Sequence, residues 1–305
     1  MKYIIDCDPG HDDAIALMLA VLSGKIPLCG VTTVAGNASI GHTTENARKI
    51  LAFCSAGDIP VYTGHSRPLS RPLLNRSGER VHGKDGLSGV TIDAVLPPLP
   101  EEHAVDFIVR TLQGQREKTT LICLGPLTNI ADTLQKAPEA AKRVDKLVIM
   151  GGAVDAPGNV TEYSEFNFYV DSEAAEIVIG SGIPTYLLPL DVTMKALFYE
   201  EEIAQLGRSA SKYARLAADL LTQYANNYRE ELGYFACPLH DALCIAVLLD
   251  PLLVKFKTRR LHITTSGAAH GMCEETADGS PVFCGVNIDR KRFVSLLVNI
   301  LNAVK

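Results

Sequence analysis

Short apolar runs alternate with amphipathic, helix-like segments along most of this chain. The runs predict strands at residues 3–7, 28–34, 120–124, 146–150 and 185–190. Between and after them, the spacing of apolar positions predicts helices at residues 12–22, 43–55, 101–112, 129–135 and 171–181. This alternation is typical of a doubly wound α/β fold, in which a mostly parallel sheet carries helices on both faces.

The second half of the chain has a different pattern. Residues 200–231 are predicted to be largely helical, and a helix from about residue 239 is followed by two strands and a closing helix from residue 289. No low-complexity linker, internal repeat or break in composition interrupts the chain, so we expect one domain over residues 1–305. Residues 66–100 are rich in proline, glycine and charge, and a loop of that length usually carries function.

Four aspartates lie between the first predicted strand and the first predicted helix, in "YIIDCDPGHDDAIALM". Asp6 and Asp8 are two positions apart on a strand and should point the same way, and Asp12 and Asp13 open the helix. The helix dipole contributes ~1 kcal/mol or less per group, too little to hold several carboxylates together. A divalent cation would suffice, and oxygen ligands favour calcium or magnesium. Alternatively, these acids are helix caps and solvated loop charges, and Asp12 has the residue type of an N-cap.

Polar residues also follow the other predicted strands. Ligands of open α/β sheets bind outside the carboxyl ends of the strands. The polar residues that follow these strands are Asn37, Thr128, Asn129, Glu165, Asn167, Asp171 and Asp191. Together with the acidic cluster they predict a metal-assisted enzyme that acts on a small polar substrate.

Histidines narrow this prediction. His240 and Asp241 stand at the head of an apolar helix in "CPLHDALCIAVLLD". His240 has the chemistry of a general acid or leaving-group partner, and Asp241 is a candidate metal ligand from a distant part of the chain. The alternative is a His-Asp pair that only begins a helix. His82, in "RVHGKDG" of the long loop, is open to the same two interpretations.

Composition excludes several classes of partner. Of 305 residues, 47% are hydrophobic and 21% charged, the net charge is −6, and no basic block occurs, which argues against a nucleic-acid surface. No apolar run approaches the ~20 residues of a membrane span. The eight cysteines are scattered without a C-x-x-C pair, so we expect free thiols. Because the acidic cluster begins at Asp6, a cleaved leader would remove it, and we expect a cytoplasmic protein.

Seven motifs together carry a family resemblance. In chain order they are "DCDPGHDDA", "TTVAGN", "GPLTNIA", "VIMGGA", "SEFNFYVDSEAA", "LDVT" and "LHD", and they span nearly the whole chain. This ordered set resembles the inosine–uridine preferring nucleoside hydrolase family. The resemblance implies a single-domain α/β fold with a mixed, mostly parallel sheet and a tightly held calcium ion. It also implies hydrolysis of the N-glycosidic bond of ribonucleosides, in nucleoside salvage, by a dimer or tetramer.

The resemblance also implies roles for individual residues. It assigns Asp8, Asp13, Asp241 and the backbone carbonyl of Leu124 to calcium. Asp8 would be the base that takes a proton from water, and Asp6 would support the cluster from behind. The residues that would hold the ribose hydroxyls are Asp12, Asn37, Met150 through its backbone, Glu165, Asn167 and Asp241.

The resemblance assigns fewer residues to the nucleobase than to the calcium ion and the ribose. His240 matches the position that contacts the departing base, and His82, Tyr228 and Tyr234 are further candidates for substrate binding. The chain has no tryptophan, so the indoles that sandwich purines in the purine-specific branch are absent. This favours a pyrimidine or mixed preference, with a purine-accepting, nonspecific enzyme as the alternative.

Two stretches depart from the family pattern, and one other enzyme class shares the first motif. Lys84 lies in "HGKDG" where family members often have "HGESG", and residues 264–286 differ from the usual late strands. A phosphatase of the haloacid-dehalogenase type also begins with a strand that bears an Asp-x-Asp pair. Such an enzyme usually has a threonine after the pair, whereas "PG" follows Asp8, and its scheme has no part for the His-Asp helix start.

Overall fold

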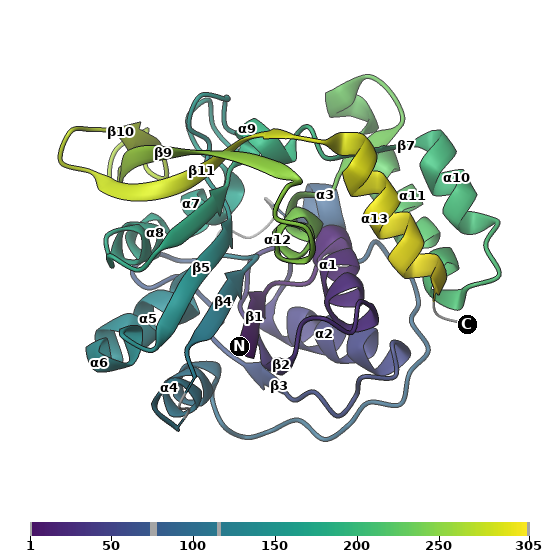
Figure 1. Ribbon diagram of the computed structural model, residues 1–305, viewed down its shortest axis with the longest axis horizontal. Coiled ribbons are helices and arrows are strands. Elements are labelled where there is room, and N and C mark those ends of the chain that lie inside the picture. The colour runs from purple at the N-terminus through teal and green to yellow at the C-terminus, as the bar shows by residue number, and fades with distance from the viewer. Residues whose placement is uncertain (1, 74–77, 115–116, 304–305) are drawn as a thin grey trace.

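The computed structural model describes residues 2–73, 78–114 and 117–303, and its centre is one nine-stranded sheet (Figure 1). The strand order is β10-β9-β11-β6-β5-β4-β1-β2-β3. Strands from β11 to β3 run parallel, whereas β9 is antiparallel to β11 and β10 to β9. The strands are β1 (Lys2–Cys7), β2 (Leu28–Thr33), β3 (Val61–Thr63), β4 (Thr119–Cys123), β5 (Val144–Met150), β6 (Thr185–Leu188), β9 (Val254–Ile263), β10 (Cys273–Glu275) and β11 (Ser280–Ile288).

Helices cover both faces of this sheet because its central strands are apolar on both sides. In β1, Ile5 packs into one hydrophobic core and Ile4 into the other, as the alternation of a strand requires. The first core includes α1 (His11–Leu22), α2 (Ile40–Phe53), α10 (Glu200–Gly207), α11 (Lys212–Leu232), α12 (His240–Leu249) and α13 (Arg290–Ala303). The second core includes α4 (Ala104–Gly114), α5 (Thr128–Lys136), α6 (Pro138–Ala141) and α8 (Ser172–Ile179).

Two of these helices, α1 and α12, are apolar on every side beyond their first turns. Residues 11–20 of α1 and 240–247 of α12 are all buried, and the two helices pack against each other beside the sheet (Figure 1). A helix that is hydrophobic all round belongs in a core. Their packing brings the acidic start of α1 close to the His-Asp start of α12, although the two sequences lie at opposite ends of the chain.

Short elements complete the end of the molecule where the strands finish. They are α3 (Glu79–His82), α7 (Phe166–Val170), α9 (Leu190–Thr193) and a small antiparallel pair of strands, β7 (Leu197–Tyr199) and β8 (Ala236–Pro238). In the loop that runs over this end, residues 78–100 have no regular element except α3, and residues 74–77 of the predicted long loop lie outside the described part. Among the described residues, no helix is long and apolar enough to cross a membrane.

The predicted fold class is confirmed: a mixed, mostly parallel sheet has helices on both faces. The five predicted strands are present, but the fifth ends at Leu188 because Pro189 begins the turn into α9. The short strand β3 was not predicted. The predicted helix over residues 200–231 is two helices, because the chain breaks after Gly207 and Ser211 caps α11 by accepting a hydrogen bond from the Ala214 N–H. The assignment of residues 1–305 to one domain stays a prediction.

Candidate functional site

Three buried carboxylates meet where α1 and α12 begin. Asp12 and Asp13 come from the first turn of α1 and Asp241 from the first turn of α12. Each offers an oxygen that lies within 4.8 Å of the other two. Among the residues that the structure describes, this is the one group of histidine, cysteine or acidic side chains with the spacing of a metal site.

The alternative of simple helix caps accounts for only one oxygen of this group. The N-cap of α1 is Gly10, not Asp12, and its N–H donates to Oδ2 of Asp13 at 2.9 Å. The side chain of Asn37 donates to the same oxygen at 3.2 Å. Oδ1 of Asp13 is buried without a hydrogen-bond partner.

Asp8 lies just beyond the end of β1, beside this group. Its Oδ2 accepts a hydrogen bond of 2.7 Å from the backbone N–H of Asn37, and its Oδ1 is buried without a partner. A Cβ atom at Gly36 or at Gly125 would overlap the carboxylate oxygens of Asp8. Glycine at these two positions therefore lets the loops after β2 and β4 close around this side chain.

Burial makes this cluster unstable as a set of bare anions. Desolvation, followed by repulsion from Asp13, raises the pKa of Asp8 well above its usual range and that of Asp12 to about 8. Desolvation and the neighbouring carboxylates likewise raise the pKa of Asp241. Buried carboxylate oxygens without partners, in groups with raised pKa values, are suited to a cation, which stabilises their anionic form. The donor set thus fits a hard divalent cation.

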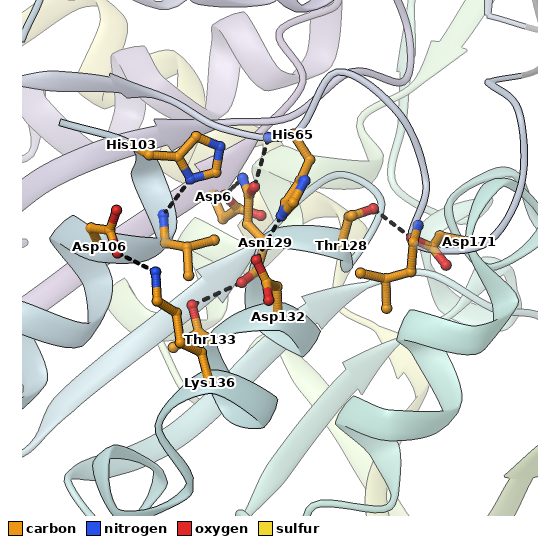
Figure 2. A network of polar contacts seen from close by, with 12 residues as sticks. Asp6, His65, His103, Asp106, Thr128, Asn129, Asp132, Thr133, Lys136 and Asp171 are labelled. Carbon is orange, nitrogen blue, oxygen red and sulfur yellow. Dashed lines mark hydrogen bonds and ion pairs between the residues drawn. The ribbon is translucent and has the colours of Figure 1, made fainter. Parts of the chain in front are cut away.

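Asp6 has hydrogen-bond partners outside the cluster, and Figure 2 shows it beside Asn129. Because β1 ends at Cys7, the alternation of a strand does not extend to Asp8, and the two carboxylates do not share a partner. Oδ1 of Asp6 accepts hydrogen bonds from the Thr32 hydroxyl at 2.6 Å and from the Asn129 side chain at 2.7 Å. Burial raises the pKa of Asp6 to about 6. Asn129 also bonds to the Thr33 carbonyl and the His65 N–H, and so fastens Asp6 to the ends of three neighbouring strands.

A cavity that opens to solvent lies over the cluster, and both polar and apolar side chains line it. The sequence-predicted residues that line it are Asp12, Asn37, His82, Leu124, Met150, Glu165, Asn167, Tyr228, His240 and Asp241. Further lining residues, which the sequence did not single out, include Arg80, Asn159 and Tyr224. No local pattern marks these three, because they reach the cavity only through the course of loops and of α11.

Four residues of the predicted site do not line the cavity, and they are Asp6, Asp8, Asp13 and Tyr234. The three aspartates are buried. Tyr234 is 46% exposed, has its ring 6.1 Å from that of Tyr199 and does not line the cavity. Lys84, the departure from the family pattern, is exposed and also stays out of the wall.

One wall of the cavity is held by Glu165 and Asn167 at the start of α7. Glu165 caps this helix by accepting the Asn167 and Phe168 N–H groups, and it also accepts the Gly152 N–H at 2.8 Å. Burial raises the pKa of Glu165 to about 7. The side-chain amide of Asn167 donates to the carbonyls of Leu124 at 2.9 Å and Met150 at 3.2 Å. This amide therefore joins the ends of β4 and β5 at the cavity.

Two buried histidines, His82 and His240, also line the cavity. His240 contacts the Thr193 hydroxyl through Nδ1 at 2.8 Å and the Tyr228 hydroxyl through Nε2 at 3.2 Å. Burial lowers the pKa of His240 to about 3, so the ring is neutral at pH 7. His82 accepts the His11 N–H through Nδ1 at 3.2 Å and stacks against the rings of His11 and Tyr224.

Comparison with known proteins identifies this architecture. A sequence profile of the inosine-uridine preferring nucleoside hydrolases matches residues 3–295. The chain belongs to this family. This nucleoside hydrolase is 40% identical over 303 residues to the pyrimidine-specific ribonucleoside hydrolase RihA of Photobacterium profundum, with 96% of each chain covered. The prediction of the family, and of an enzyme that hydrolyses N-glycosyl bonds, is confirmed, and it displaces the phosphatase alternative.

Solved structures support the same assignment. A plant nucleoside hydrolase, the PpNRh1 enzyme, superposes with a TM-score of 0.94 at 31% identity, covering 99% of both chains. A purine-preferring ribonucleoside hydrolase from Gardnerella vaginalis also gives 0.94, at 30% identity, covering 99% of this chain and 98% of that one. A nucleoside hydrolase named for purine preference thus shares this fold.

A methyl group at position 36 tests the packing around Asp8. We expect Gly36→Ala to lower kcat for nucleoside hydrolysis by about 100-fold or more, because the added carbon displaces the Asp8 carboxylate. Gly41→Ala is the matched control, since a Cβ there meets nothing within 4 Å. Gly41 lies in the first turn of α2, where alanine should raise the free energy of unfolding by up to about 1 kcal/mol. Steady-state kinetics and thermal unfolding of both variants measure this, and equal kcat values would contradict it.

Proposed function

We propose that this protein hydrolyses the N-glycosidic bond of ribonucleosides with a bound calcium ion and prefers pyrimidine or mixed substrates. The observation that carries the proposal is the convergence of buried Asp12, Asp13 and Asp241, of which Asp12 and Asp241 line a cavity. Amides and carboxylates suited to ribose and histidines suited to a base line the same cavity. A role in nucleoside salvage, a cytoplasmic location and assembly into dimers or tetramers belong to the same proposal.

The proposed ligands of the cation are Asp8, Asp13, Asp241 and the Leu124 carbonyl. Unpartnered, buried oxygens on Asp8 and Asp13 support the first two. Asp12 belongs to the converging group but also lines the cavity, whereas Asp13 does not, so we place Asp12 at the boundary between ion and sugar. An all-oxygen set that includes a backbone carbonyl suits calcium.

Asp8 is the proposed base. A bound calcium ion would lower the pKa of a water molecule that it coordinates. The hydrogen bond from the Asn37 N–H to Oδ2 fixes the orientation of the Asp8 carboxylate, which would accept the proton of the attacking water. The close approach of Gly36 and Gly125 keeps this carboxylate from turning away.

The ribose would be held by polar residues of the cavity lining. Cleavage at C1′ builds positive charge on the sugar, as in other glycoside hydrolyses. Asp12, Asn37, Glu165, Asn167 and the Met150 carbonyl would hold the hydroxyl groups. Because Glu165 is fixed by three backbone N–H groups, contacts made here can favour the distorted sugar of the transition state.

The departing base would meet His240, Tyr228 and His82. Since burial keeps His240 neutral at pH 7, this residue suits the role of a hydrogen-bond donor better than that of a charged acid. The relative named for pyrimidine specificity, at 40% identity, supports a preference for uridine and cytidine. A purine-accepting enzyme is the second candidate, since a neighbour named for purine preference has the same fold.

Side-by-side kinetics on uridine, cytidine, inosine and adenosine test the proposal. We expect hydrolysis of the pyrimidine nucleosides at least, and we expect Asp8→Asn to lower kcat by about 10³-fold or more with a KM within about fivefold, because the amide cannot accept a proton. Asp93→Asn, at an exposed site outside the cavity, is the control. Near-normal kcat in Asp8→Asn would exclude this residue as the base. No release of ribose from any nucleoside would end the proposal.

Removal of the cation should make stability depend on pH. Without it, the raised pKa of Asp12 lets the folded chain hold a proton between pH 3.8 and about 8 that the unfolded chain releases. The metal-free protein should therefore lose stability as pH rises through this range. Added calcium should raise Tm, and by more at about pH 8 than at about pH 6. Thermal unfolding with EDTA or calcium measures this effect, and identical Tm values in both would contradict calcium binding.

The role of His240 depends on the leaving group. We expect His240→Ala to lower kcat on uridine by about 10²-fold to 10⁴-fold, because the uracil anion loses its hydrogen bond. A p-nitrophenyl riboside has a stable leaving group and should lose far less. Equal losses on both substrates would reject this role.

A further inference from the structure

The motif "LDVT" follows β6 and forms α9, which contributes no residue to the cavity wall. Its position is nevertheless tightly fixed. The Asp191 carboxylate accepts the backbone N–H groups of residues 154, 155 and 156, at 2.9, 2.7 and 3.1 Å, which ties α9 to the loop after β5. The Leu239 N–H donates to the Ala196 carbonyl at 3.0 Å, which ties the chain after α9 to the start of α12.

These anchors bring the Thr193 hydroxyl against the ring of His240. Oγ1 of Thr193 lies 2.8 Å from Nδ1, and both side chains are buried. On the other side of the ring, Nε2 lies 3.2 Å from the hydroxyl of Tyr228, which lines the cavity. The ring therefore has a buried hydroxyl at Nδ1 and a residue of the cavity lining at Nε2.

The proton count between these groups has two solutions. A neutral imidazole carries one N–H and one lone pair, and a hydroxyl carries one proton. If Nδ1–H donated to Thr193, the threonine proton would need another acceptor, and among the described residues His240 is its one hydrogen-bond partner. A buried, unpaired O–H group costs about 1–3 kcal/mol. If the Thr193 hydroxyl donates to the lone pair of Nδ1 instead, its proton has an acceptor and no polar group at this contact is left unpaired.

We propose that Thr193 is a positioning residue: its hydroxyl donates to Nδ1 of His240 and holds the ring as the tautomer that presents Nε2–H to the cavity. This inference rests on the proposed function, in which His240 serves the departing base. When the C1′–N bond breaks, its electron pair moves onto the base, and the Nε2–H group stabilises that charge as a hydrogen-bond donor. No proton has to leave the ring.

The other tautomer would place a lone pair at Nε2. That lone pair would accept the Tyr228 O–H and repel an electron-rich base. The ring would then be unable to donate a hydrogen bond to the departing base, although its position stayed the same. A histidine fixed in one tautomer by a partner at the far nitrogen is a general requirement of sites in which one ring nitrogen works. In this protein the uncharged hydroxyl of Thr193 is the partner that fixes the tautomer of His240.

Thr193→Val and Thr193→Ser test the proposal. Valine has the shape of threonine without the hydroxyl, and serine keeps the hydroxyl. We expect Thr193→Val to lower kcat on uridine by about tenfold or more and kcat on p-nitrophenyl riboside by less than about twofold. Thr193→Ser should restore most of the loss. In a His240→Ala background, Thr193→Val should have no further effect on kcat.

A nitrogen-15 NMR measurement of the histidine rings separates this inference from the proposed function. In the unmodified protein, His240 should give a protonated Nε2 and an unprotonated Nδ1, whether or not any nucleoside is hydrolysed. Thr193→Val should shift this signal toward a mixture of tautomers. Thr111→Val, at a buried position on the other side of the sheet, controls for the loss of a hydroxyl and should leave the signal unchanged.

Three results would overturn the inference. They are a protonated Nδ1 in the unmodified protein, equal losses of kcat on both substrates in Thr193→Val, and a loss in Thr193→Val that adds to that of His240→Ala. If Thr193→Val does not fold, the tautomer of the unmodified protein still decides the matter. Absence of any hydrolysis, with the expected tautomer present, would count against the proposed function alone.

Discussion

Repulsion and desolvation among the carboxylates at the start of α1 and α12 form the constraint on which the rest of this structure depends. A fold that buries Asp8, Asp12, Asp13 and Asp241 together gains nothing from their charges and has raised pKa values as the direct result. The helices α1 and α12 are apolar beyond their first turns and hold Asp12, Asp13 and Asp241 in place, so the hydrophobic core supplies the stability that the polar site lacks. A bound cation would compensate the repulsion among these carboxylates, which then serve as its ligands.

The surroundings of the cluster follow from the same constraint. Glycines approach the Asp8 carboxylate where any side chain would collide with it, and Asn129 fastens Asp6 to neighbouring strands. Glu165 has its oxygens occupied by backbone N–H groups. Side chains that meet the ligand are therefore held from behind by groups that do not, as preorganised sites require. Thr193 extends this principle to the base side of the cavity.

Local sequence was sufficient for much of the fold and for most of the site. The strands and helices of the first half repeat with the periods of their own geometry, and Asp12, Asn37, Asn167 and His240 each follow a strand or open a helix, where ligands of α/β sheets bind. The ordered motifs were sufficient to identify the family, because each combines a particular backbone turn with a particular polar group. These are properties of a few neighbouring residues, so a single chain displays them.

Tertiary structure alone decided which of these residues meet. The close carboxylate group holds Asp12 rather than Asp8, Tyr234 lies outside the cavity, and Thr193 lies against His240. Each outcome depends on the relative positions of packed helices and loops that are distant in the sequence. Sequence spacing cannot express that, because such distances are determined by the volume and shape of the side chains between the elements.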